Sequence, residues 1–202
     1  MTAEVWSDGK AGASAVPHDL DLGAFDPALA GTVVRGRRLV QDTRELEPGD
    51  IFVALGRPGV PALPWVQDAL DRGAAAVLVD ATAEGEFPDL VHRVTALADV
   101  LGALSAEFTG HPSDHLTMVG ITGTNGKTST SILLTQAWRA LGVPSATVGT
   151  LGAGITGEPR INMGMTTPQV TTLHQYLADF VSRGVERVVM EVSSHALELG
   201  RV

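Results

Sequence analysis

The chain has 202 residues, of which 44% are hydrophobic, 18% are charged and 4% are aromatic. This composition is typical of a globular protein and excludes disorder over most of the length. Its 14 Lys and Arg against 23 Asp and Glu give a net charge of −9, which would repel a phosphate backbone, so we expect no nucleic-acid partner. The absence of cysteine excludes disulfides, thiolate metal sites and a cysteine nucleophile.

The beginning of the chain lacks the pattern of a targeting segment. Residues 1–10 do not show the basic and then apolar order of a signal peptide, and no apolar run approaches the roughly 18 residues that span a membrane. We therefore expect a cytoplasmic protein without a membrane partner. Residues 1–30 are rich in Gly, Ala, Asp and Pro without a sustained period, so we expect a frayed arm with a short helical turn around residues 27–30.

Residues 1–112 predict a small α/β domain. A long apolar pattern at helical spacing ends at Gly110 and Pro112, and we place a domain boundary there. His111 and His115 lie four residues apart, but the intervening proline argues against one helix face that holds both, so we favour a polar linker over a metal site. The expected elements of this domain are strands over residues 38–43, 51–55 and 75–79 and helices over residues 63–72 and 91–108.

Residues 113–202 alternate strands and helices, which is the βαβ pattern of a parallel sheet covered by helices. His174 and Tyr176 fall outside the apolar stripe of the second helix, and we expect both at the surface. The expected elements are strands over residues 116–121, 145–148 and 187–192 and helices over residues 127–141 and 169–183.

A glycine-rich segment, residues 120–129, lies between an apolar strand and a helix. Backbone N–H groups and a helix N-terminus at such a place bind phosphate. Lys127 would bring positive charge to the β- and γ-phosphates, and the Thr128 hydroxyl would bind Mg²⁺. The glycine spacing differs from the strict P-loop pattern, and the alternative is a plain strand-to-helix turn. The residues expected to bind the nucleotide are Gly123, Thr124, Asn125, Gly126, Lys127, Thr128 and Ser129.

Two further segments carry polar groups at element ends. Glu191 closes an apolar strand, and ligands of parallel sheets lie beyond the carboxyl ends of strands, so we expect it to bind the metal together with Thr128. The alternative is a capped strand end. Residues 165–168, Met-Thr-Thr-Pro, precede a helix. An N-cap at Thr167 with proline at the first helical position explains this segment without any ligand.

Together these segments resemble the Mur ligase family, most closely its members of the MurE type, which add the third amino acid of the peptidoglycan stem. The family's uridine-binding N-terminal domain is similar to the upstream part of the chain, and the likeness extends from about Val33 onward. The segments that carry the resemblance are residues 41–44, 48–55, 120–129, 165–168, 190–197 and 200–202.

The resemblance implies a fold and an activity. The fold is a small α/β uridine-binding-like domain over residues 1–112, followed over residues 113–202 by the first part of a parallel-sheet, P-loop-like ATPase domain. The activity is ATP-dependent ligation of a diamino acid, diaminopimelate or lysine, to UDP-N-acetylmuramoyl-L-alanyl-D-glutamate through an acyl phosphate. ATP and Mg²⁺ would act with the catalytic residues Lys127, Glu191 and His195.

The resemblance also assigns substrate contacts. Thr43, where the family usually has Ser, and the segment at residues 56–61 depart from the family pattern. Family members continue well past Val202, so we expect a truncated chain that is inactive by itself. Two alternatives stay open: a non-catalytic module that binds a nucleotide or a UDP-sugar, and another amide ligase of the superfamily, such as a folate polyglutamate ligase. The residues that the resemblance places at the UDP-muramoyl-peptide are Thr43, Arg57, Gly59, Thr166, Thr167, Ser193 and Arg201.

Overall fold

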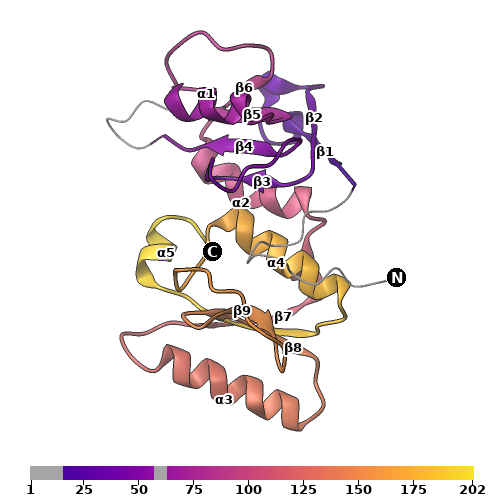
Figure 1. Ribbon diagram of the computed structural model, residues 1–202, viewed down its shortest axis with the longest axis vertical. Coiled ribbons are helices and arrows are strands. Elements are labelled where there is room, and N and C mark those ends of the chain that lie inside the picture. The colour runs from indigo at the N-terminus through magenta and orange to yellow at the C-terminus, as the bar shows by residue number, and fades with distance from the viewer. Residues whose placement is uncertain (1–15, 57–62) are drawn as a thin grey trace. The chain divides into compact units, whose positions relative to one another are not determined.

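The computed structural model describes residues 16–56 and 63–202. The chain divides into two compact units, of which one ends at Phe108 and the other begins at Thr109. Each unit has a four-stranded, mainly parallel sheet of its own, as Figure 1 shows, and this α/β architecture confirms the predicted fold class. None of the helices in the described part of the chain has the length and apolar character that a membrane span requires.

The first unit is built on a parallel sheet whose strands follow one another in chain order, β3-β4-β5-β6. Strands β4 and β5 are almost wholly buried, which is why they read as continuous apolar runs. An antiparallel hairpin of β1 and β2 precedes this sheet. The elements are β1 (His18–Asp21), η1 (Leu22–Ala24), η2 (Pro27–Leu29), β2 (Val33–Gly36), β3 (Leu39–Val40), β4 (Ile51–Ala54), α1 (Leu63–Asp71), β5 (Ala76–Asp80), β6 (Val91–Val94) and α2 (Leu97–Phe108).

Two expectations for this unit are wrong. The frayed arm does not extend to residue 30, because β1 pairs with β2 and the side chains of Leu20 and Leu22 are fully buried. The predicted helix over residues 91–108 begins only at Leu97, and its first part is strand β6. Pairing of β6 with the buried strand β5 overrides the helical spacing of its apolar residues.

A buried ion pair organises the turn before β4. The Arg38 guanidinium donates to the Asp50 carboxylate, with Nη2 to Oδ2 at 2.5 Å, and both residues are at most 5% exposed. Arg38 also donates to the Glu45 carbonyl, and the Glu47 amide donates to Asp50. Burial alone would lower the pKa of Arg38, but the hydrogen bonds and charge of Asp50 raise it above its ordinary value.

The second unit has the sheet order β7-β10-β8-β9, in which β10 is parallel to both β7 and β8, and β9 forms an antiparallel hairpin with β8. Helix α3 packs on β7, β8 and β10, and α4 covers the opposite face of the sheet (Figure 1). The elements are η3 (Pro112–His115), β7 (Thr117–Ile121), α3 (Lys127–Ala140), β8 (Ser145–Gly149), β9 (Gly152–Ile155), α4 (Val170–Ser182), β10 (Arg187–Glu191) and α5 (Ser194–Glu198).

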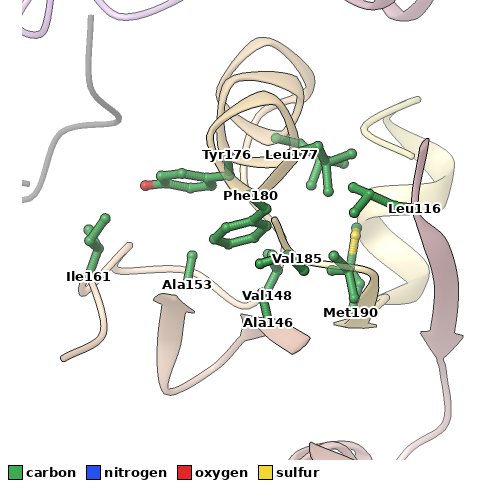
Figure 2. Close-up of a cluster of buried hydrophobic side chains, with 12 residues drawn as sticks. Leu116, Ala146, Val148, Ala153, Ile161, Tyr176, Leu177, Phe180, Val185 and Met190 are labelled. Atoms are coloured by element: carbon green, nitrogen blue, oxygen red, sulfur yellow. The ribbon is translucent and has the colours of Figure 1, made fainter. Parts of the chain in front are cut away.

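The core of the second unit lies between α4 and the sheet. Figure 2 shows Tyr176, Leu177 and Phe180 of α4 above Val148 and Met190 of the strands. Tyr176 is 3% exposed, so the prediction that it lies at the surface is wrong. The buried face of α4 is wider than a narrow apolar stripe because a sheet, rather than a single helix, covers it. The parallel strands β7, β8 and β10 bring their carboxyl ends to one edge of the sheet.

Candidate nucleotide and metal site

The loop between β7 and α3 has the backbone of an anion site. Gly123 and Gly126 have φ values of 137° and 82°, a conformation that residues with a side chain rarely adopt. Gly126 is the N-cap of α3 and provides no side-chain cap, so the amides of the first turn can face an anion. The Lys127 ammonium donates to the Gly123 carbonyl, with Nζ to O at 2.7 Å. The exposed members of the predicted nucleotide site are Gly123, Thr124, Asn125, Gly126 and Ser129.

Glu191 ends β10 and is only 1% exposed. The Thr128 hydroxyl in the first turn of α3 donates to its Oε2 atom at 2.9 Å. The structure therefore brings together the two residues that the sequence predicts as metal ligands, although 62 residues separate them in the chain. Thr128 and Glu191 meet because β10 pairs in parallel with β7, whose end leads directly into the glycine-rich loop before α3.

The β8–β9 turn supplies two contacts to Glu191 that sequence reasoning missed. The Thr150 amide donates to Oε1 at 3.1 Å, and the Thr150 hydroxyl donates to Oε2 at 3.0 Å. A Cβ atom at Gly149 would lie 2.3 Å from Oε1, so the carboxylate occupies the space that a side chain would need. No chemical motif marks this turn; only the pairing of β8 with β10 brings it beside the acid.

The segment before α4 also contacts the end of β10, through the backbone of Glu191 and Ser193. The Thr167 hydroxyl donates to the Glu191 carbonyl at 3.0 Å and accepts from the Ser193 amide at 3.2 Å. The N-cap of α4 is Gln169, so the prediction that Thr167 caps this helix is wrong. Thr167 is 2% exposed, whereas the neighbouring Thr166 is half-buried and its hydroxyl lies 3.2 Å from that of Thr150.

The remaining predicted residues of this unit lie on and after α5. The Ser193 hydroxyl caps α5 by accepting from the Ala196 amide at 3.1 Å. His195 is exposed, and its Nδ1 atom lies 4.0 Å from a carboxylate oxygen of Glu198. Arg201 is half-buried, and its amide donates to the Ala196 carbonyl at 2.9 Å.

The predicted uridine contacts belong to the first unit. The hydroxyl of Thr43 is hydrogen-bonded to Asp68, and this bond is the largest of the contributions that lower the pKa of that carboxyl. Arg57 and Gly59 lie outside the described residues. The neighbouring Arg44 folds back on Asp42, with Nε to Oδ1 at 2.9 Å, so the turn that carries Thr43 is held by local hydrogen bonds.

The residues around Glu191 fit a magnesium ion bound together with phosphate. A threonine hydroxyl that donates to a carboxylate still has lone pairs for a cation, and hydroxyl and carboxylate oxygens are ligands that Mg²⁺ prefers. Within the described residues, no group of three or more His, Cys, Asp or Glu could hold a metal. The protein would therefore supply Thr128 and Glu191, and phosphate and water would supply the other ligands, which is usual for Mg²⁺ at nucleotide sites.

The comparison with known proteins identifies the family. Residues 121–202 match the model of the Mur ligase middle domain. The chain is 50% identical over 178 residues to the UDP-N-acetylmuramoyl-L-alanyl-D-glutamate–2,6-diaminopimelate ligase of Xylella fastidiosa strain 9a5c, a match that covers 87% of this chain and 35% of that protein. The chain belongs to the Mur ligase family.

Further Mur ligases are similar at lower identity. The diaminopimelate ligase of Pseudomonas aeruginosa is 42% identical over 170 residues, 82% of this chain and 34% of that protein. A solved diaminopimelate ligase structure has a TM-score of 0.67 at 28% identity and covers 82% of this chain and 34% of its own. The structure of the MurF ligase from Thermotoga maritima in complex with ADP has a TM-score of 0.54 at 25% identity. This match covers 78% of the present chain and 32% of the MurF chain. The chain thus spans about a third of the length of these Mur ligases.

Proposed function

We propose that the whole protein is an ATP-dependent ligase of peptidoglycan precursor synthesis. It would join 2,6-diaminopimelate to UDP-N-acetylmuramoyl-L-alanyl-D-glutamate, as the names of the relatives from Xylella and Pseudomonas state for those proteins. The observation that carries the proposal is the hydrogen bond between Thr128 and Glu191, because it joins the hydroxyl after the phosphate-loop lysine to a buried acid at a neighbouring strand end.

The phosphate loop would bind ATP. Its backbone amides and the first turn of α3 would face the phosphates, and Lys127 would exchange its bond to the Gly123 carbonyl for phosphate oxygens. Thr128 and Glu191 would hold Mg²⁺, whose positive charge stabilises the charge that spreads over the transferred phosphoryl group.

The acceptor substrate would lie next to this loop. A carboxylate oxygen of the muramoyl dipeptide would attack the γ-phosphorus of ATP and release ADP, and the diaminopimelate amine would then displace phosphate from the acyl phosphate. Thr166, Ser193 and Arg201 would contact the peptide end and hold it in line, which lowers the entropic part of the barrier. His195 would line the same pocket, and the buried Thr167 would act by holding the backbone at the end of β10.

The two units would divide the substrates. We assign residues 1–112 to a UDP-binding domain and residues 113–202 to the first part of the ATP-binding domain. Thr43, Arg57 and Gly59 would contact the uridine end. Because the Thr43 hydroxyl is bonded to Asp68, it would offer the nucleotide its remaining lone pairs.

Ligation by the whole protein tests the proposal. Purified protein is supplied with ATP, Mg²⁺, the UDP-muramoyl dipeptide and either diaminopimelate or lysine, and the amide product and ADP are measured. We expect product with diaminopimelate and ADP release that depends on the dipeptide. Substitution Lys127→Ala should reduce turnover about 100- to 1000-fold, since it removes a charge that stabilises the transition state.

The matched control is Arg139→Ala, which removes an exposed cation from the last turn of the same helix and should leave turnover unchanged. Wild-type turnover by Lys127→Ala would remove the phosphate-binding role of this residue. A preference for lysine over diaminopimelate would change the substrate assignment. ADP release without any amide product would contradict the ligase activity and indicate a nucleotide hydrolase instead.

A further inference from the structure

We infer that Thr150 is a positioning residue that fixes the orientation of the Glu191 carboxylate for the metal and links it to the segment before α4. The inference rests on the proposed function, because it assumes that Glu191 binds the metal. Among the described residues, Thr150 is the one whose hydrogen bonds reach both carboxylate oxygens of Glu191, through its amide at 3.1 Å and its hydroxyl at 3.0 Å. Two donors on one residue fix the plane of a carboxylate, whereas the single bond from Thr128 leaves it free to rotate.

The backbone of the β8–β9 turn depends on its glycines and is closely packed at Gly152. Gly149 pairs with Gly152, so Thr150 and Leu151 form a two-residue hairpin loop. Gly152 has a φ of 104°, and a Cβ atom there would lie 2.1 Å from the Ile161 carbonyl oxygen. The close packing at Gly152 fixes the end of the hairpin loop, and the position of Thr150 relative to β10 is set by the parallel pairing of β8 with β10.

The hydroxyl of Thr150 also determines the direction of a hydrogen-bond chain. An ionised carboxylate accepts only, so the single hydroxyl proton of Thr150 goes to Glu191. The oxygen of Thr150 then accepts from the Thr166 hydroxyl, 3.2 Å away. This order, from Thr166 to Thr150 to Glu191, connects a predicted substrate-contact segment to the metal-binding acid through one side chain.

Manganese binding by the whole protein tests the inference without measuring catalysis. Free Mn²⁺ is followed by electron paramagnetic resonance during titration in the presence of ADP. Thr150→Val keeps the amide donor and the side-chain shape but removes the hydroxyl. Because loss of a residue that orients a metal ligand typically costs 10- to 100-fold in metal affinity, we expect Mn²⁺ binding to weaken by about tenfold or more. Thr150→Ser, which restores the hydroxyl, should bind Mn²⁺ close to the wild-type affinity.

The control is Thr156→Val, which removes a hydroxyl–hydroxyl bond of 2.9 Å to Ser145 at the other end of the β8–β9 hairpin. Thermal midpoints without metal are recorded for all variants. Loss of Mn²⁺ affinity in Thr150→Val alone, with a midpoint shift no larger than that of Thr156→Val, would support the positioning role. A parallel shift of the Mg²⁺ requirement of ligation to higher concentration would support it further.

Three results would overturn the inference: wild-type Mn²⁺ affinity in Thr150→Val, an equal loss in Thr156→Val, or no recovery in Thr150→Ser. Failure of the wild-type protein to bind Mn²⁺ with ADP would be a different result, because it would overturn the proposed function and the inference with it. The wild-type titration therefore separates the two failures.

Discussion

Two buried carboxylates, one in each unit, are stabilised in opposite ways. Asp50 is fully buried and is held by the Arg38 guanidinium, a permanent cation within the same unit. Glu191 is 1% exposed and accepts from the amide of Thr150 and from two threonine hydroxyls. Among the described residues, no Lys or Arg forms an ion pair with Glu191.

We propose that this difference separates an acid with a structural role, Asp50, from an acid that binds a cation, Glu191. Burial of an unpaired charge is costly, and a neighbouring cation offsets that cost inside the folded chain. The charge of Asp50 is therefore balanced without a bound ion, and its ion pair with Arg38 organises the turn that leads into β4. The hydrogen bonds of Glu191 orient the carboxylate but leave its charge uncompensated, so a cation from solution gains a preformed partner.

The largest expected effect is that of Asp50→Asn on the stability of the first unit. The groups that face Asp50 are guanidinium and amide N–H groups, which only donate, so the NH₂ of asparagine would meet donors and Arg38 would lose its buried carboxylate partner. We expect a loss of about 3–5 kcal/mol, the usual cost of breaking a buried pair. Hydrogen exchange of peptides that cover β4 and β5 would measure it.

The control for Asp50→Asn is Asp19→Asn, which removes an exposed ion pair with Arg35 in the same unit. Exposed pairs contribute at most about 1 kcal/mol, so this variant should exchange nearly as slowly as the wild type. Similar losses of protection from hydrogen exchange in Asp50→Asn and Asp19→Asn would contradict the structural role of the buried pair.

Glu191→Gln should not lower stability in the way that Asp50→Asn does. The NH₂ of glutamine can donate to the Thr128 and Thr150 hydroxyls, which can turn to accept, while the carbonyl still accepts from the Thr150 amide. Without metal we expect unchanged or higher stability in urea denaturation. With the Mg²⁺–ADP complex at about 100 times its dissociation constant from the wild type, the wild type should gain about 2.7 kcal/mol, and the variant should gain less because it binds the metal more weakly. Destabilisation without metal would contradict the idea that the charge is uncompensated.

Gly149→Ala tests how closely the chain surrounds the same carboxylate. The new Cβ atom would lie 2.3 Å from Oε1 and 2.8 Å from Cδ of Glu191, so the buried side chain must move and give up its contacts to Thr150. Overpacking of this kind costs about 1–3 kcal/mol. Gly120→Ala in β7 is the matched variant, because its Cβ atom would meet Val192 at an ordinary 3.5 Å. Equal urea midpoints for the two variants would contradict the prediction.

The smallest expected effect concerns His174, a group that avoids a buried charge by losing its proton. Burial, and secondarily the charge of His111, lowers the pKa of His174, and its Nδ1 atom is buried without a hydrogen-bond partner within the described residues. The unfolded chain therefore binds more protons, and stability should fall as the pH drops through about 6.5, the ordinary value of histidine. In urea denaturation between neutral and mildly acidic pH, His174→Gln should flatten this slope. Parallel slopes would contradict the prediction.

Local patterns predicted the parts of the site that lie within one strand–loop–helix unit. The strand before Gly123, the turn and the start of α3 at Lys127 occur where glycines, lysine and helical spacing indicate them. Glu191 at a strand end followed from the general place of ligands in parallel sheets. These features depend on residues that are neighbours in the chain, and a sequence displays such neighbours directly.

Contacts between distant segments were not predictable from the sequence. Thr150 and Gly149 reach Glu191 only through the pairing of β8 with β10, and neither residue type indicates metal chemistry. Thr167 looked like a helix cap, because a cap needs only local sequence, but its hydroxyl bonds to the end of another strand. Strand β6 was mistaken for helix for the same reason, since its partner β5 decides its conformation.

The order of strands in the second unit has a consequence for synthesis and folding. In the first unit each strand of the parallel sheet pairs with the next along the chain, so the sheet can grow as the chain leaves the ribosome. In the second unit β10 lies between β7 and β8 although it follows both of them in the chain, and among the described residues β7 pairs only with β10, with Thr117 beside Arg187. Pairings this distant are slow to form because the loop must close first. Glu191 ends β10, so its carboxylate reaches the Thr128 hydroxyl only once this distant pairing has formed.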